Sequence, residues 1–251
     1  MPPVTHIPFY LDWPFWDAVV AAIAIVLSQL PPVRLLLKPA KLELELYSRA
    51  YLLHKVGNPN MQLHLIINNI GGRAVKIKGI TSTIQRDGKL ICSLTASSYY
   101  QKADDKTSVL FTPFSLKPEE EWGHIVIFLN FFPREDEKKF RSAESQLKEV
   151  INTKLKQVAN KNEVVEADND QVSVFSKMFD RMFIWQPGEY EATISIEAVP
   201  VSVNIKKSFR FTLFESDSAE LAKSKDDYKS GDGIYWESGK HPGVGVPVNQ
   251  A

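Results

Sequence analysis

Residues 41–48, which read KLELELYS, decide the class of fold because their apolar and charged side chains alternate. In an extended chain, successive side chains point to opposite faces, so Leu42, Leu44 and Leu46 would lie together on one face. Glu43 and Glu45 would lie on the other face, in contact with solvent. The stretch therefore predicts a β-strand that is buried on one side.

Similar apolar stretches recur along the chain, separated by residues that favour turns. Residues 56–60 (VGNPN) predict a turn, and Asp87 with Gly88 predicts the turn of a hairpin. Gly79 lies inside a strand pattern and predicts a bulge or kink. The further expected strands are MQLHLIINN (61–69), AVKIKGITSTIQ (74–85), KLICSLTA (89–96), TSVLFTPFSL (107–116), WGHIVIFLNFF (122–132), RMFIW (181–185), GEYEATISIEAV (188–199) and KKSFRFTLFE (206–215).

A different period appears in residues 133–160, where apolar residues recur every three or four positions. This spacing places them on one face of an amphipathic helix. Pro133 suits the first turn of that helix, and acidic residues follow it near the positive end of the helix dipole. The apolar positions are Phe140, Ala143, Leu147, Val150, Ile151, Leu155 and Val158.

These patterns together predict a mainly β fold. We expect an antiparallel immunoglobulin-like β-sandwich with one inserted amphipathic helix and an apolar N-terminal helix. Residues 1–37 would form the N-terminal helix and its flanks, residues 38–215 the sandwich with its insertion near residues 133–160, and residues 216–251 a polar C-terminal tail. In this tail, residues 218–228 (SAELAKSKDDY) predict a short helix and residues 241–251 (HPGVGVPVNQA) predict no fixed structure.

The apolar stretch FWDAVVAAIAIVLSQLPPV (15–33) suggests a membrane anchor. The absence of Lys and Arg from the first 33 residues argues against a cleaved signal peptide. Aromatic residues precede the apolar centre and basic residues follow it, which predicts a single-pass inner-membrane protein with a cytoplasmic body. A helix lying in the membrane interface, or buried in a soluble core, is the alternative. The expected anchor residues are Tyr10, Trp13, Phe15, Trp16, Val19, Ile23, Ile25, Leu27 and Leu30.

The composition limits the classes of partner and the redox chemistry. Thirty basic residues balance thirty acidic ones, so the net charge is zero and nucleic acid is not expected as a partner. The one cysteine, Cys92, allows no intramolecular disulfide. Its place in a strand pattern beside Ile91 and Leu94 favours a small core residue over a reactive thiol.

A search for catalytic and metal-binding motifs gives no positive result. No two of the five histidines lie within eight residues of each other, and no zinc, calcium or nucleophile-elbow motif occurs. We therefore expect no catalytic residue, no metal site and no cofactor. Tyr99, Tyr100, Trp122 and Trp185 suggest a surface on which a sugar could stack, but core positions are favoured for the two tryptophans.

Large apolar side chains interrupt the polar C-terminal tail. Ile234, Tyr235 and Trp236 would dock either on a partner or on the protein's own body. The pattern does not decide between these two interpretations.

Three stretches resemble bacterial immunoglobulin-like adhesion and accessory domains. LHLIINNIGGRAVKIKGI (63–80) resembles their early strands, FSLKPEEEW (114–122) the turn before a central strand, and PGEYEATISIEA (187–198) with FRFTLFE (209–215) their closing hairpin. The likeness covers residues 41–215, interrupted by the helix near residues 133–160. It implies a binding or spacing module and assigns no functional residue.

The first functional hypothesis is a non-enzymatic, membrane-tethered β-sandwich that binds or positions a partner protein at a bacterial membrane, with membrane lipid as a second partner. An enzyme with a site made of dispersed residues, such as His54, His64, Asp104 and His124, is the alternative. A further alternative is an outward-facing module that binds carbohydrate or other envelope components.

Overall fold

The computed structural model describes residues 13–29, 38–102, 104–157, 165–237, 239–241 and 243–250. These residues form a mainly antiparallel β fold with helices. The strands are β1 (Leu42–Lys55), β2 (Asn58–Asn69), β3 (Val75–Arg86), β4 (Lys89–Tyr100), β5 (Val109–Leu110), β6 (Phe114–Leu116), β7 (Glu121–Leu129), β8 (Gly188–Val199), β9 (Ile205–Leu213), β10 (Val244–Pro247) and β11 (Asn249–Gln250). The helices are α1 (Trp13–Gln29), α3 (Arg134–Gln157), α4 (Asn169–Met182) and α5 (Glu215–Ala222), with the 3-10 helices η2 (Val201–Val203) and η3 (Lys223–Ser230).

All of these strands belong to one sheet, in the order β10-β1-β2-β7-β4-β3-β8-β9-β11, with β5 on β4 and β6 on β3. The sheet curls until it is nearly closed and barrel-like. It is continuous because β3 pairs with β8 on one side and with β4 on the other, and β4 then pairs with β7. The antiparallel β class is as predicted, whereas the two separate sheets expected of a sandwich are not confirmed.

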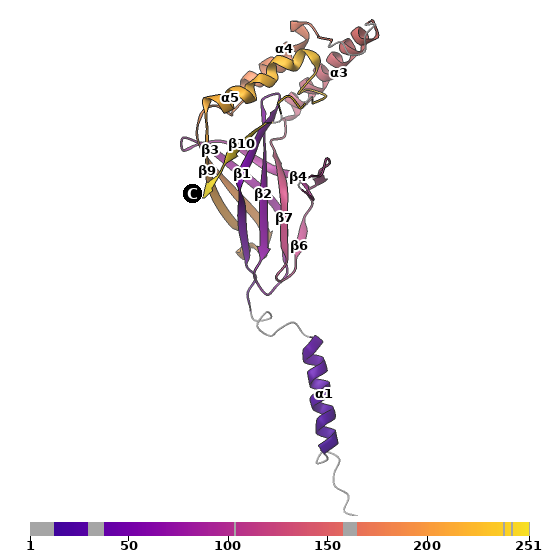
Figure 1. The fold of residues 1–251 in the computed structure, drawn as a ribbon, viewed down its shortest axis with the longest axis vertical. Helices are drawn as coiled ribbons and strands as arrows, with labels where there is room; N and C mark the ends of the chain where they lie inside the picture. The colour runs from indigo at the N-terminus through magenta and orange to yellow at the C-terminus, as the bar shows by residue number, and fades with distance from the viewer. Residues whose placement is uncertain are drawn as a thin grey trace, which may run out of the picture.

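The C-terminal segment joins the two edges of this sheet. Strand β10 pairs with β1, and β11, which follows after one residue, pairs with β9. Figure 1 shows the C-terminus beside β9 and β10. The prediction that residues 241–251 have no fixed structure is therefore wrong for β10 and β11. Their pattern is weak because the segment is short and contains glycine and proline, and its order comes from the strand edges on either side.

Most strand predictions are confirmed in position and in the face that they bury. Leu42 and Leu44 are buried, and the register of β3 against β8 shifts between Ile77 and Gly79, as the predicted bulge requires. The predicted strand RMFIW is wrong. Its first residues end α4, and its Trp185 is buried with the indole Nε1 donating to the Leu53 carbonyl at 2.7 Å.

The predicted amphipathic helix near residues 133–160 is confirmed as α3, which buries Phe140, Ala143, Leu147 and Ile151. Helix α4 was not predicted. It packs against α3 on one side and η3 on the other. Figure 1 shows α3, α4 and α5 gathered at one end of the sheet. We call α3, α4, α5 and η3 the helical cap.

The buried residues form two clusters. The larger one fills the sheet and includes Leu52, Leu65 and Ile194. The second joins α3, α4 and η3 to the tip of the β1–β2 hairpin, where Val56 is 1% exposed. The hairpin tip thus enters the helical cap and fixes it to the sheet.

The length of helix α1 does not agree with the predicted membrane anchor. No helix in the described part of the chain is long and apolar enough to cross a membrane. With 17 residues, α1 would extend over about 26 Å, less than the ~30 Å of a bilayer core. The single-pass anchor and the inner-membrane localisation are therefore wrong.

Some of the expected anchor residues lie within the described part of the chain and others lie outside it. Tyr10 and Leu30 lie outside the described residues. Val19 is half-buried, and the side chains that are exposed on α1 are Trp13, Phe15, Trp16, Ile23, Ile25 and Leu27.

Candidate functional site

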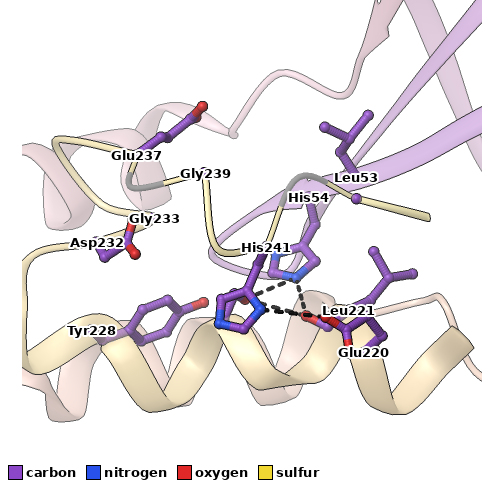
Figure 2. A pocket seen from close by; sticks show the side chains of 12 residues that line it. Leu53, His54, Glu220, Leu221, Tyr228, Asp232, Gly233, Glu237, Gly239 and His241 are labelled. Carbon is purple, nitrogen blue, oxygen red and sulfur yellow. Dashed lines mark hydrogen bonds and ion pairs between the residues drawn. The ribbon is translucent and has the colours of Figure 1, made fainter. Parts of the chain in front are cut away.

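A pocket of about 360 Å³ lies where the helical cap meets the sheet. This volume is within the range of small-molecule sites in proteins. Its lining comes from the end of β1, from α5 and η3, and from the loop between η3 and β10, as Figure 2 shows. The side chains from β1, α5 and η3 are Leu53, His54, Glu220, Leu221, Ser224 and Tyr228. The loop contributes Asp232, Gly233, Glu237, Gly239, His241 and Gly243.

His54 is held in one orientation and one tautomer by the chain around it. The Gly57 backbone N–H donates to Nδ1 at 3.1 Å, so Nδ1 carries no hydrogen. The hydrogen is therefore on Nε2, which lies 2.8 Å from the Leu221 carbonyl. Burial is the main cause that lowers the pKa of His54 below its ordinary 6.5, which keeps the ring neutral.

The position of His54 follows from the turn after β1. Val56 and Gly57 both have positive φ angles, of 51° and 80°, which reverse the chain tightly at the hairpin tip. The His54 ring packs against Phe179 and Phe183 of the cap, with ring centroids 5.3 and 5.4 Å away. The same turn thus places the ring both in the pocket and against the cap.

His241 connects the loop to a group of charged residues at the pocket edge. Its Nε2 lies 2.9 Å from the Asp227 carboxylate, and its Nδ1 lies 3.6 Å from Glu220. Lys223 donates to the carboxylate of Glu220 and lowers the pKa of that group. These contacts hold the loop against α5 and η3, and because they are partly exposed each contributes little to stability.

Two buried polar atoms of the pocket lining, the Tyr228 hydroxyl and Nδ1 of His241, make no hydrogen bond to a described residue. The Tyr228 side chain is 1% exposed. Burial raises the pKa of Tyr228 far above its ordinary value, and the Ser224 hydroxyl, which bonds by its geometry to His54 and to the backbone carbonyl three residues earlier rather than to the phenol, only partly opposes this effect. Figure 2 shows the Tyr228 hydroxyl directed into the space that His241 and Asp232 also line.

The lining is acidic. Glu220, which pairs with Lys223, and Asp232 and Glu237 contribute carboxylates, and no Lys or Arg is among the described residues that line the pocket. Asp232 is 6% exposed, and Lys240 lies outside the lining, 3.5 Å from Asp227. The pocket therefore offers carboxylate groups to a ligand that enters it.

The apolar residues expected to dock on a partner or on the body lie next to this pocket. Ile234 is 1% exposed and belongs to the cluster beneath the helical cap. Tyr235 packs against that cluster, close over Gly231, where an added Cβ would lie 2.3 Å from its ring. Trp236 stays 42% exposed while its Nε1 donates to the Ser230 carbonyl at 3.0 Å. Ile234 thus docks on the protein itself.

The dispersed residues considered for an enzyme are not brought together. His64 faces Ile125 in the sheet and the adjacent Leu65 faces His124, so the two imidazoles project from opposite faces. The His124 ring contacts those of Tyr99 and Trp122, and of the four dispersed residues only His54 lines the pocket.

Neither Cys92 nor the aromatic residues that were considered for sugar stacking offer a site. Cys92 is partly buried against the core, and burial raises its pKa to about 12, so little thiolate forms at neutral pH. Trp185 is 0% exposed and Trp122 is 9% exposed, so no sugar-stacking surface includes them. Within the described segments, no group of three or more His, Cys, Asp or Glu residues is arranged to hold a metal ion.

Sequence reasoning missed Glu220, Tyr228, Asp232 and His241 as a set. One signal was present, because Leu221, Ser224 and Tyr228 recur at three and four residues in the segment predicted to be a short helix. That spacing places them on one helix face. The loop residues gave no such signal, since their positions depend on where β10 pairs.

Comparisons with known proteins give no family. No family model and no curated protein matches the chain. Among solved structures, the chain is similar to a protein from Archaeoglobus fulgidus, with 8% identity over 67% of this chain and 94% of that chain and a TM-score of 0.29. A likeness at that TM-score carries no argument about function.

Proposed function

We propose that the protein is a non-enzymatic binding protein whose ligand enters the pocket between the helical cap and the sheet. The observation that supports this most is the Tyr228 hydroxyl, which is buried at the pocket and has no hydrogen-bond partner among the described residues. A buried polar group without a partner costs about 1–3 kcal/mol. A ligand that satisfies this hydroxyl removes the cost.

The hydrogen bonds of His54 argue against nucleophilic catalysis. Ser224 Oγ lies 3.1 Å from Nε2 of His54, which resembles the contact between a nucleophile and its base. A general base must accept the proton of the nucleophile. Here Nε2 carries the ring hydrogen, because Nδ1 already accepts the Gly57 N–H, so it has no lone pair for Ser224.

The proposal keeps the binding role expected from the sequence but omits the membrane tether. The expected immunoglobulin-like arrangement is not required, because the pocket depends on the helical cap and the C-terminal loop. Both partner classes that remain, a protein side chain and a free small molecule, are compatible with a pocket of this volume.

A fragment screen tests the binding role. A chemically mixed set of neutral, anionic and cationic fragments is screened by thermal shift against the wild type, Ser224→Leu and Ser145→Leu. Leu at position 224 occupies the pocket, whereas Ser145 is exposed on α3 and serves as the matched control. We expect fragments that raise the melting temperature of the wild type and the control but not of Ser224→Leu. Hits that bind all three proteins equally, or no hits, would contradict the proposal.

An esterase assay tests the non-enzymatic part. With p-nitrophenyl acetate, we expect the same slow release of p-nitrophenolate from the wild type and from Ser224→Ala. A burst of product that disappears in Ser224→Ala would show that Ser224 is a nucleophile.

A further inference from the structure

We propose that the pocket recognises its ligand through an ammonium group. This inference rests on the proposed function and names the class of ligand for the same pocket. It follows from the charges of the lining, from the hydrogen-bonding capacity of Tyr228 and from the shape of the apolar part.

The carboxylates of the pocket lining favour a ligand with a positive charge. The carboxylates of Asp232 and Glu237 line the pocket, as does that of Glu220, which Lys223 partly neutralises. An anionic ligand would meet repulsion here with no lining Lys or Arg to offset it. A cation is attracted by the carboxylates that line the pocket.

The hydrogen-bonding groups of the pocket favour an ammonium group over a bare metal ion. The described residues contain no set of three or more ligands with metal-binding geometry. An ammonium group carries three N–H donors, and carboxylate and phenol oxygens accept such hydrogen bonds. The Tyr228 hydroxyl oxygen is one such acceptor, because it makes no hydrogen bond to a described residue.

The remaining lining suits a short hydrocarbon chain. Leu53 and Leu221 present apolar side chains, and Gly239, where no atom lies within 4 Å of an added Cβ, leaves space in the lining. A chain of about four methylenes fits a volume of about 360 Å³ with room for water. Both a free alkylamine and the lysine side chain of a partner protein have this form.

Isothermal titration calorimetry with three probes of the same length tests the charge. The probes are n-butylammonium, n-butanol and butyrate, each titrated into the full chain at low salt. We expect n-butylammonium to bind at least tenfold more tightly than the other two, with an affinity that falls as salt is added. Equal or tighter binding of butanol or butyrate would overturn the ammonium inference, while hits in the fragment screen would leave the binding role standing.

Variants then locate the site. Tyr228→Phe removes only the hydroxyl and is expected to weaken n-butylammonium binding about tenfold. Glu237→Gln, at an exposed position, is expected to weaken it several-fold. Tyr47→Phe, the same change at a 58% exposed position on β1, serves as the control and should bind like the wild type. Unchanged affinity in both pocket variants would place the ammonium group elsewhere and overturn the inference.

A last probe distinguishes the two sources of the group. Acetyl-Ala-Lys-Ala-amide presents a lysine side chain in a peptide. Tighter binding of this peptide than of n-butylammonium supports a partner protein as the source, and the reverse order supports a free amine. If neither binds although the fragment screen finds other ligands of the pocket, the ammonium inference is wrong and the proposed binding role still holds.

Discussion

At the scale of single residues, His54 and Tyr228 line the same pocket but differ in how their polar atoms are satisfied. Both ring nitrogens of His54 lie within hydrogen-bond distance of groups in the chain, whereas the Tyr228 hydroxyl bonds to no described residue. His54 therefore acts as a structural residue that fixes the hairpin tip. Tyr228 is the residue whose environment a ligand would change most.

The neutral state of His54 predicts a pH dependence of stability. Its pKa is lowered in the folded protein, so the unfolded chain binds the proton more tightly. Above about pH 6.5 the ring is neutral in both states and does not change the free energy of unfolding. As the pH falls below that value, the unfolded chain takes up the proton first, and the free energy of unfolding falls by up to about 1.4 kcal/mol per pH unit. Urea unfolding at several pH values between 5 and 8 measures this slope.

Two variants assign this pH dependence to His54. Gln has no ring to titrate, so His54→Gln should have a shallower slope than the wild type. His64→Gln, on β2 away from the cap, should retain the slope. An unchanged slope in His54→Gln would contradict the assignment.

Residues whose role depends on local pattern could be read from the sequence. The alternation of Leu42 and Leu44 with glutamates gives their burial, and the apolar neighbours of Cys92 give its partly buried position. The pocket residues could not be read in this way. Asp232 and His241 come together with His54 only after the chain has closed the sheet.

At the scale of elements, the β1–β2 hairpin tip joins the helical cap to the sheet. An added Cβ at Gly57 would lie 2.7 Å from the Phe179 carbonyl oxygen of α4, and the residue has a φ of +80°. Gly57→Ala should therefore lower the free energy of unfolding by about 2–4 kcal/mol, through backbone strain and displacement of α4. Chemical denaturation followed by circular dichroism measures the change.

Gly88 provides the matched control for this substitution. It has a similar φ of +75°, but no atom lies within 4 Å of an added Cβ. Gly88→Ala should show only the backbone cost, about 1 kcal/mol. Equal losses in the two variants would mean that the contact with α4 contributes nothing.

The strands β10 and β11 are predicted to stabilise the sheet by covering its two edges. Deletion of residues 244–251 would expose the edges of β1 and β9, which pair with these strands. Exposed edges favour association between chains. We therefore expect the truncated protein to unfold at a lower temperature and to form oligomers, as size-exclusion chromatography with light scattering would show. A monomer with the melting temperature of the wild type would contradict this.

The elements that could be predicted are those with a strong local period. Helix α3 was predicted from its apolar stripe, whereas α4 was missed, and its last residues were interpreted as the start of the strand RMFIW (181–185). Its signal was nevertheless present, since Val172, Phe175 and Phe179 are buried at helical spacing. Strands β10 and β11 carry no such period, and their formation depends on pairing partners more than 30 residues away in the sequence.

At the scale of the whole molecule, α1 shares no buried cluster with the sheet or the helical cap. Apart from Val19, its side chains at residues 13–28 are exposed. Removal of residues 1–37 should therefore leave the melting temperature of the remaining chain unchanged within about 2 °C. Differential scanning calorimetry measures this, and a clear loss of stability would show that α1 packs on the body.

The architecture as a whole could be predicted only in class. The period-2 pattern gives an antiparallel β fold, but it does not distinguish a sandwich from one continuous curled sheet. That difference depends on the pairing of β4 with both β3 and β7, and on the closing strands. The same long-range pairing forms the pocket, which explains why composition and motifs gave no site.

The central claim is that the pocket binds a ligand at the Tyr228 hydroxyl. Its most direct test is NMR of the protein labelled with ¹³C at the Cζ atom of tyrosine, titrated with n-butylammonium, with Tyr228→Phe used to assign the signal. A hydrogen bond to the hydroxyl changes the shielding of Cζ. We predict a saturable shift of the Tyr228 signal while the signal of the exposed Tyr47 stays constant. A Tyr228 signal that does not move at saturating n-butylammonium would contradict the account.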